Sequence, residues 1–302
     1  MEPSDRPKSS PISDGAFYFI AGFCGLAGGI AGAAFHLTVD WLLHWPAWLI
    51  ARFGSGFETI LMAAAIAAAG VLAAFLLTRR FAPEAAGSGV QEIEGAMEGV
   101  RIVRWRRVLP VKFVAGVLAL SSGLVAGREG PTIHIGASIA AGIAELFRLD
   151  RDDMRGLLAA GAAAGLAAAF NAPLAAILFI VEETRKQFRY TFRSYVGVIC
   201  ASAASALGMG LVGGTAPPLR IAALEQPLWL LPAFVLLGVG LGGLGVVFNR
   251  CLLGALDWTA DTFRRAPFVP ALVVGATVGA LAIVLPEAVG GGEFLIPHLV
   301  AR

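Results

Sequence analysis

Long apolar stretches alternate along the chain with short segments that carry its charges. Each of these stretches runs for 20 residues or more without Asp, Glu, Lys or Arg. A bilayer core requires about 20 apolar residues of helix, and a spanning segment must satisfy its own backbone hydrogen bonds. The pattern therefore predicts several membrane helices. The uncharged stretches are residues 15–39, 59–78, 156–181, 194–219, 226–249 and 266–286.

Glycine or proline interrupts several of the expected helices. Broken helices are tolerated in lipid only where protein encloses them or where they line a cavity. They are typical of transporter binding sites, where half-helix N-termini face an anion. The predicted fold class is an all-α membrane protein with broken and re-entrant helices. We expect helices at residues 16–43, 59–77, a short one ending at 97, 108–125, 132–147, 155–183, 194–212, 228–256 and 268–285, with breaks at 83–89, 127–131 and 170–173.

Composition supports this interpretation and narrows the classes of function. The chain is 57% hydrophobic and 15% charged, whereas a soluble domain carries about 25% charged residues. Its net charge of +2 gives no indication of a nucleic-acid partner, and none is expected. The basic stretch at residues 101–107 is predicted to be cytoplasmic.

The cysteine pattern does not indicate a metal site, and the sequence lacks the catalytic motifs that would indicate a hydrolase. Cys24, Cys200 and Cys251 lie in separate apolar stretches and are interpreted as reduced packing residues. The chain has no CxxC and no His/Cys metal spacing, so no metal or cofactor is expected. An intramembrane hydrolase is disfavoured because the H-E-x-x-H and G-x-S-G motifs are absent.

An internal repeat is visible in the sequence. Its two matches have offsets of 213 and 203 residues, so they agree in order and nearly in register. Glycine-rich helices also resemble one another by chance, but the shared pattern P-E-A-x-G-x-G is less easily random. Internal repeats are typical of secondary transporters. The matching sets are Gly25, Gly29, Gly32 and Phe35 with Gly238, Gly242, Gly245 and Phe248, and residues 83–89 with residues 286–292.

The repeat suggests three regions. Residues 1–14 are polar and are predicted to form a disordered cytoplasmic tail. The apolar run after them is too long for the core of a signal peptide and is expected to remain as the first helix. Residues 15–215 would form a complete first transmembrane repeat, and residues 226–302 would begin a second one.

Two glycine-rich motifs have the chemistry of an anion site, namely Gly87-Ser88-Gly89 and Gly127-Arg128-Glu129-Gly130-Pro131. Glycine lets the backbone approach a ligand closely. A helix that begins there presents unpaired N–H groups and a partial positive dipole. The Ser88 hydroxyl adds a donor. Together these groups favour an anion without a full positive charge, which suits an ion that must bind and also leave.

Glu129 is the unusual member of the second motif. Acidic residues inside a membrane are costly and are usually functional. A carboxylate at an anion site competes with the anion for the same donors, and once protonated it is neutral and can leave. One residue would then be both gate and proton carrier. The alternative is a glutamate on a loop surface that pairs with Arg128.

These motifs resemble the ClC family of chloride channels and chloride/proton exchangers. Gly127–Pro131 matches the family's second filter motif in full, and Gly87–Gln91 matches the first except at Val90 and Gln91. Residues 162–183 resemble a further long family stretch, and the likeness extends over essentially the whole chain. The resemblance implies a ClC-type inverted-repeat fold, with the first repeat complete and the second only begun.

The resemblance also implies roles for individual residues. Ser88 would be a ligand of chloride, and Gly89, Arg128 and Gly130 would line the anion site. Glu129 would be the external gating and proton-transfer glutamate. Glu183 would be the internal proton-transfer glutamate of exchangers. The implied partners are chloride ions, protons, the lipid bilayer and, at full length, a second copy in a homodimer, within an inner or plasma membrane.

The departures from the family pattern leave alternatives open. Gln91 lacks the preset φ of the usual proline but can still supply an N–H. The family's third filter segment, GxFxP, and its filter tyrosine are not found, and Gly292–Pro297 is not counted as that segment. The chain is therefore expected to be a fragment or a truncated product that inserts in membranes without selective chloride transport. The other alternative is a passive channel, although Glu183 favours an exchanger.

Three further polar residues have either two possible roles or a purely structural one. Lys112 interrupts an apolar helix, where it either raises the local potential for anions or extends to the cytoplasmic edge. His134 is interpreted as a packing or hydrogen-bonding residue. Glu182 precedes Glu183, and one of these two acids could be only a polar helix end.

Overall fold

The computed structural model describes residues 12–213 and 227–291, and all of the regular secondary structure in these residues is helical. Short 3₁₀ segments lie at Pro83–Ala85 (η1), Leu228–Leu230 (η2) and Pro286–Ala288 (η3). The α-helices are α1 Asp14–Leu42, α2 Trp45–Phe53, α3 Phe57–Phe81, α4 Val90–Glu98, α5 Trp105–Ser121, α6 Glu129–Leu146, α7 Arg151–Phe170, α8 Pro173–Thr184, α9 Phe192–Gly213, α10 Leu231–Arg265 and α11 Val269–Val284.

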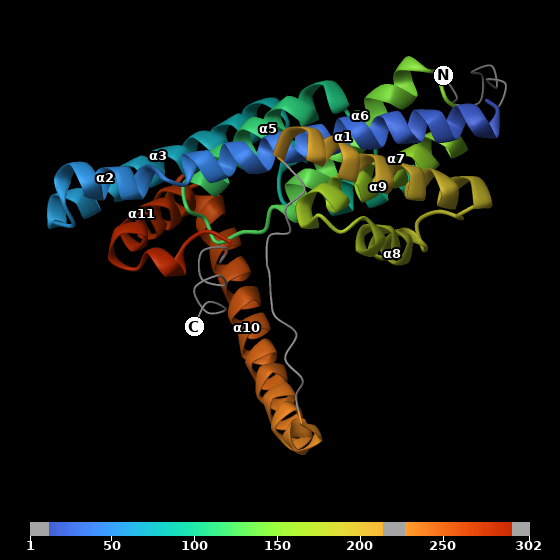
Figure 1. Ribbon diagram of the computed structural model, residues 1–302. Helices are drawn as coiled ribbons and strands as arrows, with labels where there is room; N and C mark the ends of the chain where they lie inside the picture. The colour runs from blue at the N-terminus through green and yellow to red at the C-terminus, as the bar shows by residue number, and fades with distance from the viewer. Residues whose placement is uncertain (1–11, 214–226, 292–302) are drawn as a thin grey trace.

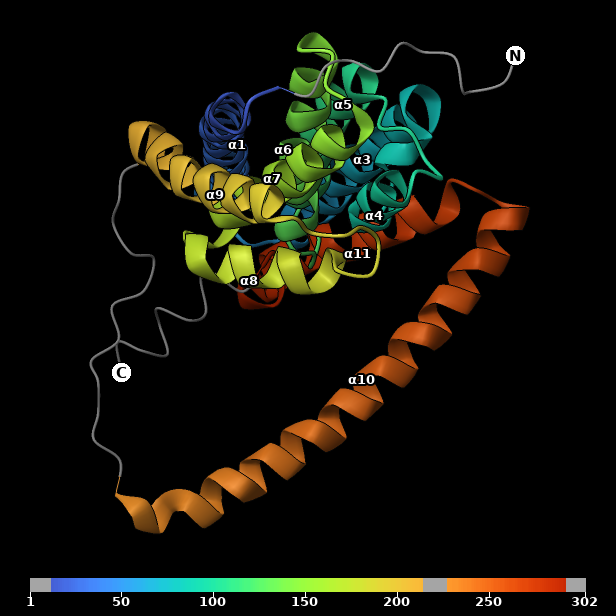
Figure 2. The same cartoon turned by 90° about the vertical axis from the view of Figure 1, so that its right-hand side faces the viewer.

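Most of the helices form one elongated bundle, and α10 projects away from it (Figures 1 and 2). No described residue of α10 is buried. An apolar helix that is exposed all round is suited to lipid or to another protein surface, and not to water. Four helical segments of the described residues are long and apolar enough to cross a membrane: Asp14–Phe53, Phe57–Phe81, Phe192–Gly213 and Leu231–Arg265.

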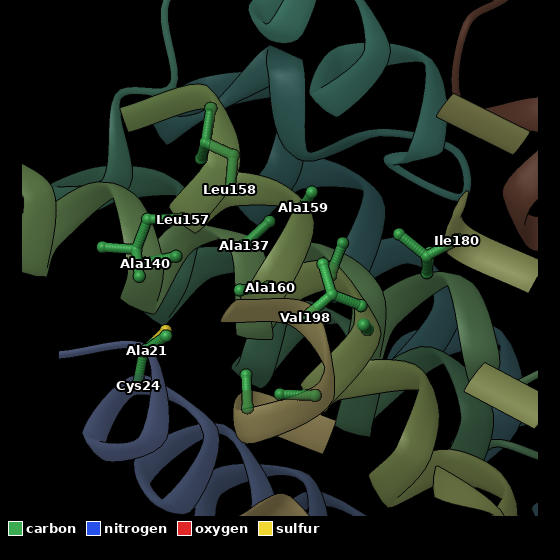
Figure 3. Close-up of a cluster of buried hydrophobic side chains, with 14 of the residues drawn as sticks. Ala21, Cys24, Ala137, Ala140, Leu157, Leu158, Ala159, Ala160, Ile180 and Val198 are labelled. Carbon is green, nitrogen blue, oxygen red and sulfur yellow. The ribbon is translucent and has the colours of Figure 1, made fainter. Parts of the chain in front are cut away.

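Small residues hold the bundle together. A side chain at Gly25 or Gly29 of α1 would overlap the α9 backbone at Ala201 or Ser205. Membrane helices pack closely where small residues let their backbones approach. The same alanine-rich packing fills the core between α1, α6, α7, α8 and α9, as Figure 3 shows. Its labelled residues are Ala21, Cys24, Ala137, Ala140, Leu157, Leu158, Ala159, Ala160, Ile180 and Val198.

The internal repeat is visible in the backbone. Pro83–Ala85 and Pro286–Ala288 are both 3₁₀ segments, and each follows an apolar helix, α3 or α11. Gly87 and Gly290 then adopt the same left-handed conformation, with φ of 67° and 74°. The helices α3 and α11 also pack against each other, where Gly275 lies against the backbone of Ala68. The two matched P-E-A-x-G segments therefore have the same local backbone conformation.

The helix boundaries differ from the predicted ones at a few places. α6 begins at Glu129 and not at residue 132, because Pro131 is tolerated in a first turn that needs no N–H from it. α5 ends at Ser121 and not at 125. α10 continues to Arg265, nine residues past the predicted end at 256, with two arginines in its last turn. Helix α2 was not predicted.

Some predictions fall outside the described residues. These are most of the tail at 1–14, the boundary between the two repeats, and the segment 292–297. At the edge of the tail, Ser13 is the N-cap of α1, and its side chain accepts a hydrogen bond from the N–H of Ala16. The first helix thus begins at Asp14, one residue before the predicted repeat.

Candidate functional site

The N-termini of α4 and α6 meet and bring the two glycine-rich motifs together. Gly89, in the left-handed region with φ of 91°, is the N-cap of α4, and Arg128 is the N-cap of α6. A Cβ atom at Gly130 would lie 2.9 Å from the Cα of Ser88, so only glycine permits this approach. Two sets of unpaired helix N–H groups consequently converge on one region, as an anion site requires.

Ser88 has a hydrogen-bond partner of its own within the first motif. Its hydroxyl donates to Oε1 of Gln91 at 3.1 Å and accepts from the backbone N–H of Val90 at 3.3 Å. Ser88 is exposed within the described structure. The hydroxyl can therefore donate to an anion only if its hydrogen bond to Gln91 breaks. Gln91, which departs from the family pattern, would compete with an anion for this hydroxyl.

Lys112 of α5 and His134 of α6 hold this motif from two sides. The Nζ of Lys112 donates to the carbonyls of Ala85 and Gly87, at 3.0 and 2.6 Å. Lys112 is buried, so it does not extend to a membrane edge. The imidazole of His134 packs so closely on Gly89 that any side chain there would overlap it. Nδ1 of His134 is buried and has no hydrogen-bond partner among the described residues.

Glu129 is the first residue of α6, and its side chain folds back over its own turn. A Cβ atom at Gly127 would overlap Oε2 of Glu129, so the glycine makes room for the carboxylate. The hydroxyl of Thr132 donates to the carbonyls of Arg128 and Glu129, at 3.1 and 2.9 Å, and fixes the turn. Arg128 is buried, and its Nη1 lies 2.6 Å from Oδ1 of Asp40 on α1.

A cavity of about 360 Å³ adjoins this turn, and the second copy of the repeat forms its other wall. The N–H of Gly290 donates to the carbonyl of Gly123 at 3.0 Å and ties the two walls together. Glu287 lines this cavity together with Glu129. The sequence analysis did not predict a role for Glu287. The repeat alignment offered a signal, because Glu287 matches Glu84. The lining residues are Val125, Ala126, Gly127, Arg128, Glu129, Glu287, Ala288, Val289, Gly290 and Gly291.

The structure places Glu183 away from this cavity and next to Glu94 of α4. Burial, the charges of Glu183 and Glu98, and a hydrogen bond with Glu183 raise the pKa of Glu94. Two carboxyl groups can share a hydrogen bond only when one of them is protonated. Sequence reasoning missed Glu94, although it is an acid in the short helix that directly follows the first motif.

Helix α4 links the two sets of residues. Its N-terminus lies at Ser88 and Gly89, and Glu94 lies on its body. Glu94 lies six positions after Ser88, which corresponds to roughly 9 Å along the helix axis. A single short helix thus carries the first glycine-rich motif at its N-terminus and a carboxyl group of raised pKa on its body.

Residues 70–302 match a protein family described as voltage gated chloride channel. That match covers more than half of the chain. The chain belongs to this family. A relative from Vibrio vulnificus (strain YJ016), named "H(+)/Cl(-) exchange transporter ClcA", is 41% identical over 300 residues, which are 96% of this chain and 63% of the relative. The ClcA of Vibrio cholerae serotype O1 (strain M66-2) is 42% identical over 287 residues, 93% of this chain and 61% of that protein.

Solved structures of this family have the same fold. A slow cyanobacterial Cl⁻/H⁺ antiporter is 34% identical, with a TM-score of 0.85 over 94% of this chain and 67% of the other. A CLC-type fluoride/proton antiporter is 20% identical with a TM-score of 0.71, which supports the fold alone. The chain spans less than two thirds of the length of the curated relatives above. With its apolar helices, this family member is a multi-pass membrane protein.

Proposed function

We propose that this chain forms part of the transport pathway of a chloride/proton antiporter. The observation that carries the proposal is the placement of Glu129 at the N-terminus of α6, where Gly130 touches Ser88 at the N-terminus of α4. Helix N-termini favour anions, and the carboxylate of Glu129 is itself an anion. Chloride and ionised Glu129 therefore compete for the same donors, which couples chloride binding to protonation of Glu129.

The charged side chains support an orientation in the membrane. Arg193 bridges Asp14 and Asp153 at 2.9 Å each, and Arg106 pairs with Glu145 near the end of α6. Because of these contacts, the basic segment 101–107 and the start of α1 lie at the same end of the bundle. That end is cytoplasmic by the positive-inside rule. Glu129 begins α6 at the other end, roughly 24 Å away.

The pair of Glu94 and Glu183 then lies on the cytoplasmic side of Ser88. The guanidinium of Arg155, near the start of α7, donates to the carbonyl of Glu98 at 3.5 Å, so the C-terminus of α4 faces the basic end. Glu183 precedes Arg185 and Lys186 in the sequence. A proton taken up at Glu129 from outside would reach the inner solution through this carboxyl pair.

A passive chloride channel is the second candidate. It would need the donors at α4 and α6 but no internal carboxyl that holds a proton. The raised pKa of Glu94 beside Glu183 favours the antiporter, because a proton is retained there at higher pH. The names of the curated relatives, which are H(+)/Cl(-) exchange transporters, agree with this choice. A homodimer remains an expectation from the family resemblance.

The test is a paired flux measurement in liposomes with a protein that contains these residues. Chloride efflux and proton uptake are recorded for the wild type and for Glu129→Gln, which mimics the protonated acid. We expect chloride flux to persist and its coupling to protons to disappear. Proton uptake that is unchanged in Glu129→Gln would remove Glu129 from the mechanism, and proton uptake that is absent from the wild type would favour the channel.

A further inference from the structure

Arg128 is held from α1 by two side chains that lie one helical turn apart. Its Nη1 is 2.6 Å from Oδ1 of Asp40 and 3.5 Å from Nδ1 of His36. The side chain of Arg128 is only 7% exposed, whereas that of Asp40 is 47% exposed. Because His36 and Asp40 are four residues apart on a helix, they reach the same guanidinium from one face. Neither residue belongs to the motifs that carry the anion site.

The position of Arg128 gives this ion pair an electrostatic consequence. Arg128 caps α6, precedes Glu129 and lines the same cavity as Glu129 and Glu287. A full positive charge at this place would strengthen anion binding, and an ion that binds too tightly leaves too slowly for transport. The carboxylate of Asp40 offsets part of that charge and also fixes where the guanidinium lies.

We propose that Asp40 is a positioning residue of the anion pathway that holds Arg128 against α1 and weakens its attraction for the transported anion. This inference rests on the proposed function, because it assigns Asp40 to the same site. The guanidinium remains charged next to the N-terminus of α6. It also pairs with the Asp40 carboxylate, which is not one of the groups that would bind the anion. Asp40 then sets the balance between anion binding and anion release.

The ion pair is not the main structural link between α1 and the start of α6. Asp40 is about half exposed, so solvent screens its side of the pair. α1 is already anchored beside Asp40 by the fully buried side chains of Phe35 and Val39, which pack with α5 and α6 residues. Charge at the cavity is therefore the property that substitution of Asp40 changes most.

The experiment compares Asp40→Asn with the wild type in liposomes reconstituted with a protein that contains these residues. The half-saturating chloride concentration should fall by roughly threefold or more, since the removed charge is the one that pairs with Arg128 beside the cavity and charges there interact at an intermediate dielectric constant. The maximal rate should fall as release slows. Raising ionic strength with potassium gluconate should reduce the difference between the two proteins, because salt screens exposed charges.

The chain offers a matched control at the other end of the same helix. Asp14 also pairs with an arginine, Arg193, at 2.9 Å, and is exposed. Asp14→Asn removes the same charge from α1 roughly 39 Å away along the helix, so it should leave the half-saturating concentration unchanged. Asp40→Glu keeps the charge and should restore wild-type behaviour. Asp40→Ser provides a second neutral variant if the asparagine variant folds poorly.

The outcomes separate this inference from the proposed function. A half-saturating concentration that is unchanged or raised in both Asp40→Asn and Asp40→Ser overturns the role of Asp40. An equal effect of Asp14→Asn overturns it as well, since a remote charge would then act alike. The proposed function fails independently if Glu129→Gln leaves proton coupling intact, whatever Asp40 does.

Discussion

The Nζ of Lys112 donates a 2.6 Å hydrogen bond to the carbonyl of Gly87, one residue before Ser88. The same ammonium holds the carbonyl of Ala85 at 3.0 Å. A lysine in the middle of an apolar helix thus donates to one buried and one part-buried backbone carbonyl. It fixes the loop that presents Ser88 and Gly89 at the start of α4.

Lys112→Met should therefore destabilise the fold and disorder the first motif. The substitution keeps the length of the side chain but leaves two carbonyls without their donor, at about 1–3 kcal/mol for each buried unsatisfied group. The melting temperature in detergent should drop by several degrees, and chloride affinity should fall. Lys112→Arg, which retains a cationic donor, should lose less stability. An unchanged melting temperature for Lys112→Met would contradict this account of the loop.

Substitution of Gln91 should change chloride affinity through Ser88. In Gln91→Ala the Ser88 hydroxyl loses its acceptor within the motif and becomes available to an anion. A typical hydrogen bond has a net value of about 0.5–1.5 kcal/mol, so chloride should bind roughly twofold to tenfold more tightly. Gln91→Glu adds a negative charge beside the hydroxyl and should weaken binding. Isothermal titration with chloride measures both, and shifts in the same direction would refute the competition between Gln91 and chloride.

Glu183→Gln should abolish proton transport and leave chloride movement. The glutamine keeps the shape and hydrogen-bonding capacity of the side chain but cannot release a proton to the inner solution. Proton and chloride fluxes are recorded together in liposomes. The neighbouring variant Glu182→Gln is the control and should retain coupled transport. If both fluxes fall together in Glu183→Gln, the carboxylate has a structural role instead.

Glu94→Gln should make stability less dependent on pH. The pKa of Glu94 is raised in the folded protein, first by burial and next by the charge of Glu183. Ionisation is therefore less favourable in the folded state than in the unfolded state. The stability that comes from this difference is present below the ordinary carboxyl pKa and is lost as pH rises through the raised pKa.

Melting temperatures measured from about pH 4 to about pH 8 test this expectation. Wild-type stability should decline more than that of Glu94→Gln across the interval. Glu98→Gln removes only a weaker source of the pKa shift and should have a smaller effect in the same direction. A Glu94→Gln profile parallel to that of the wild type would show that no such shift exists.

Several features of this protein could be predicted from local pattern alone. Four of the six uncharged stretches overlap the helices that are long and apolar enough to cross a membrane, since the thickness of the bilayer sets a minimum length for each. The break at 170–173 was predicted by Pro173, and the structure ends α7 at Phe170 and begins α8 at Pro173. The repeated P-E-A-x-G-x-G pattern predicted two equivalent turns, because glycine readily adopts the left-handed φ that Gly87 and Gly290 have.

The sequence by itself determined that this is a helical membrane protein of the chloride channel family, and it identified Ser88, Glu129 and Glu183 as candidates. Only the tertiary structure decided which residues touch. Asp40 and Arg128 form an ion pair, and the charge of Glu183 raises the pKa of Glu94, across long separations in the chain. The physical reason is that hydrophobic patterning and turn chemistry act over a few residues, whereas pairing of charges depends on how whole helices pack.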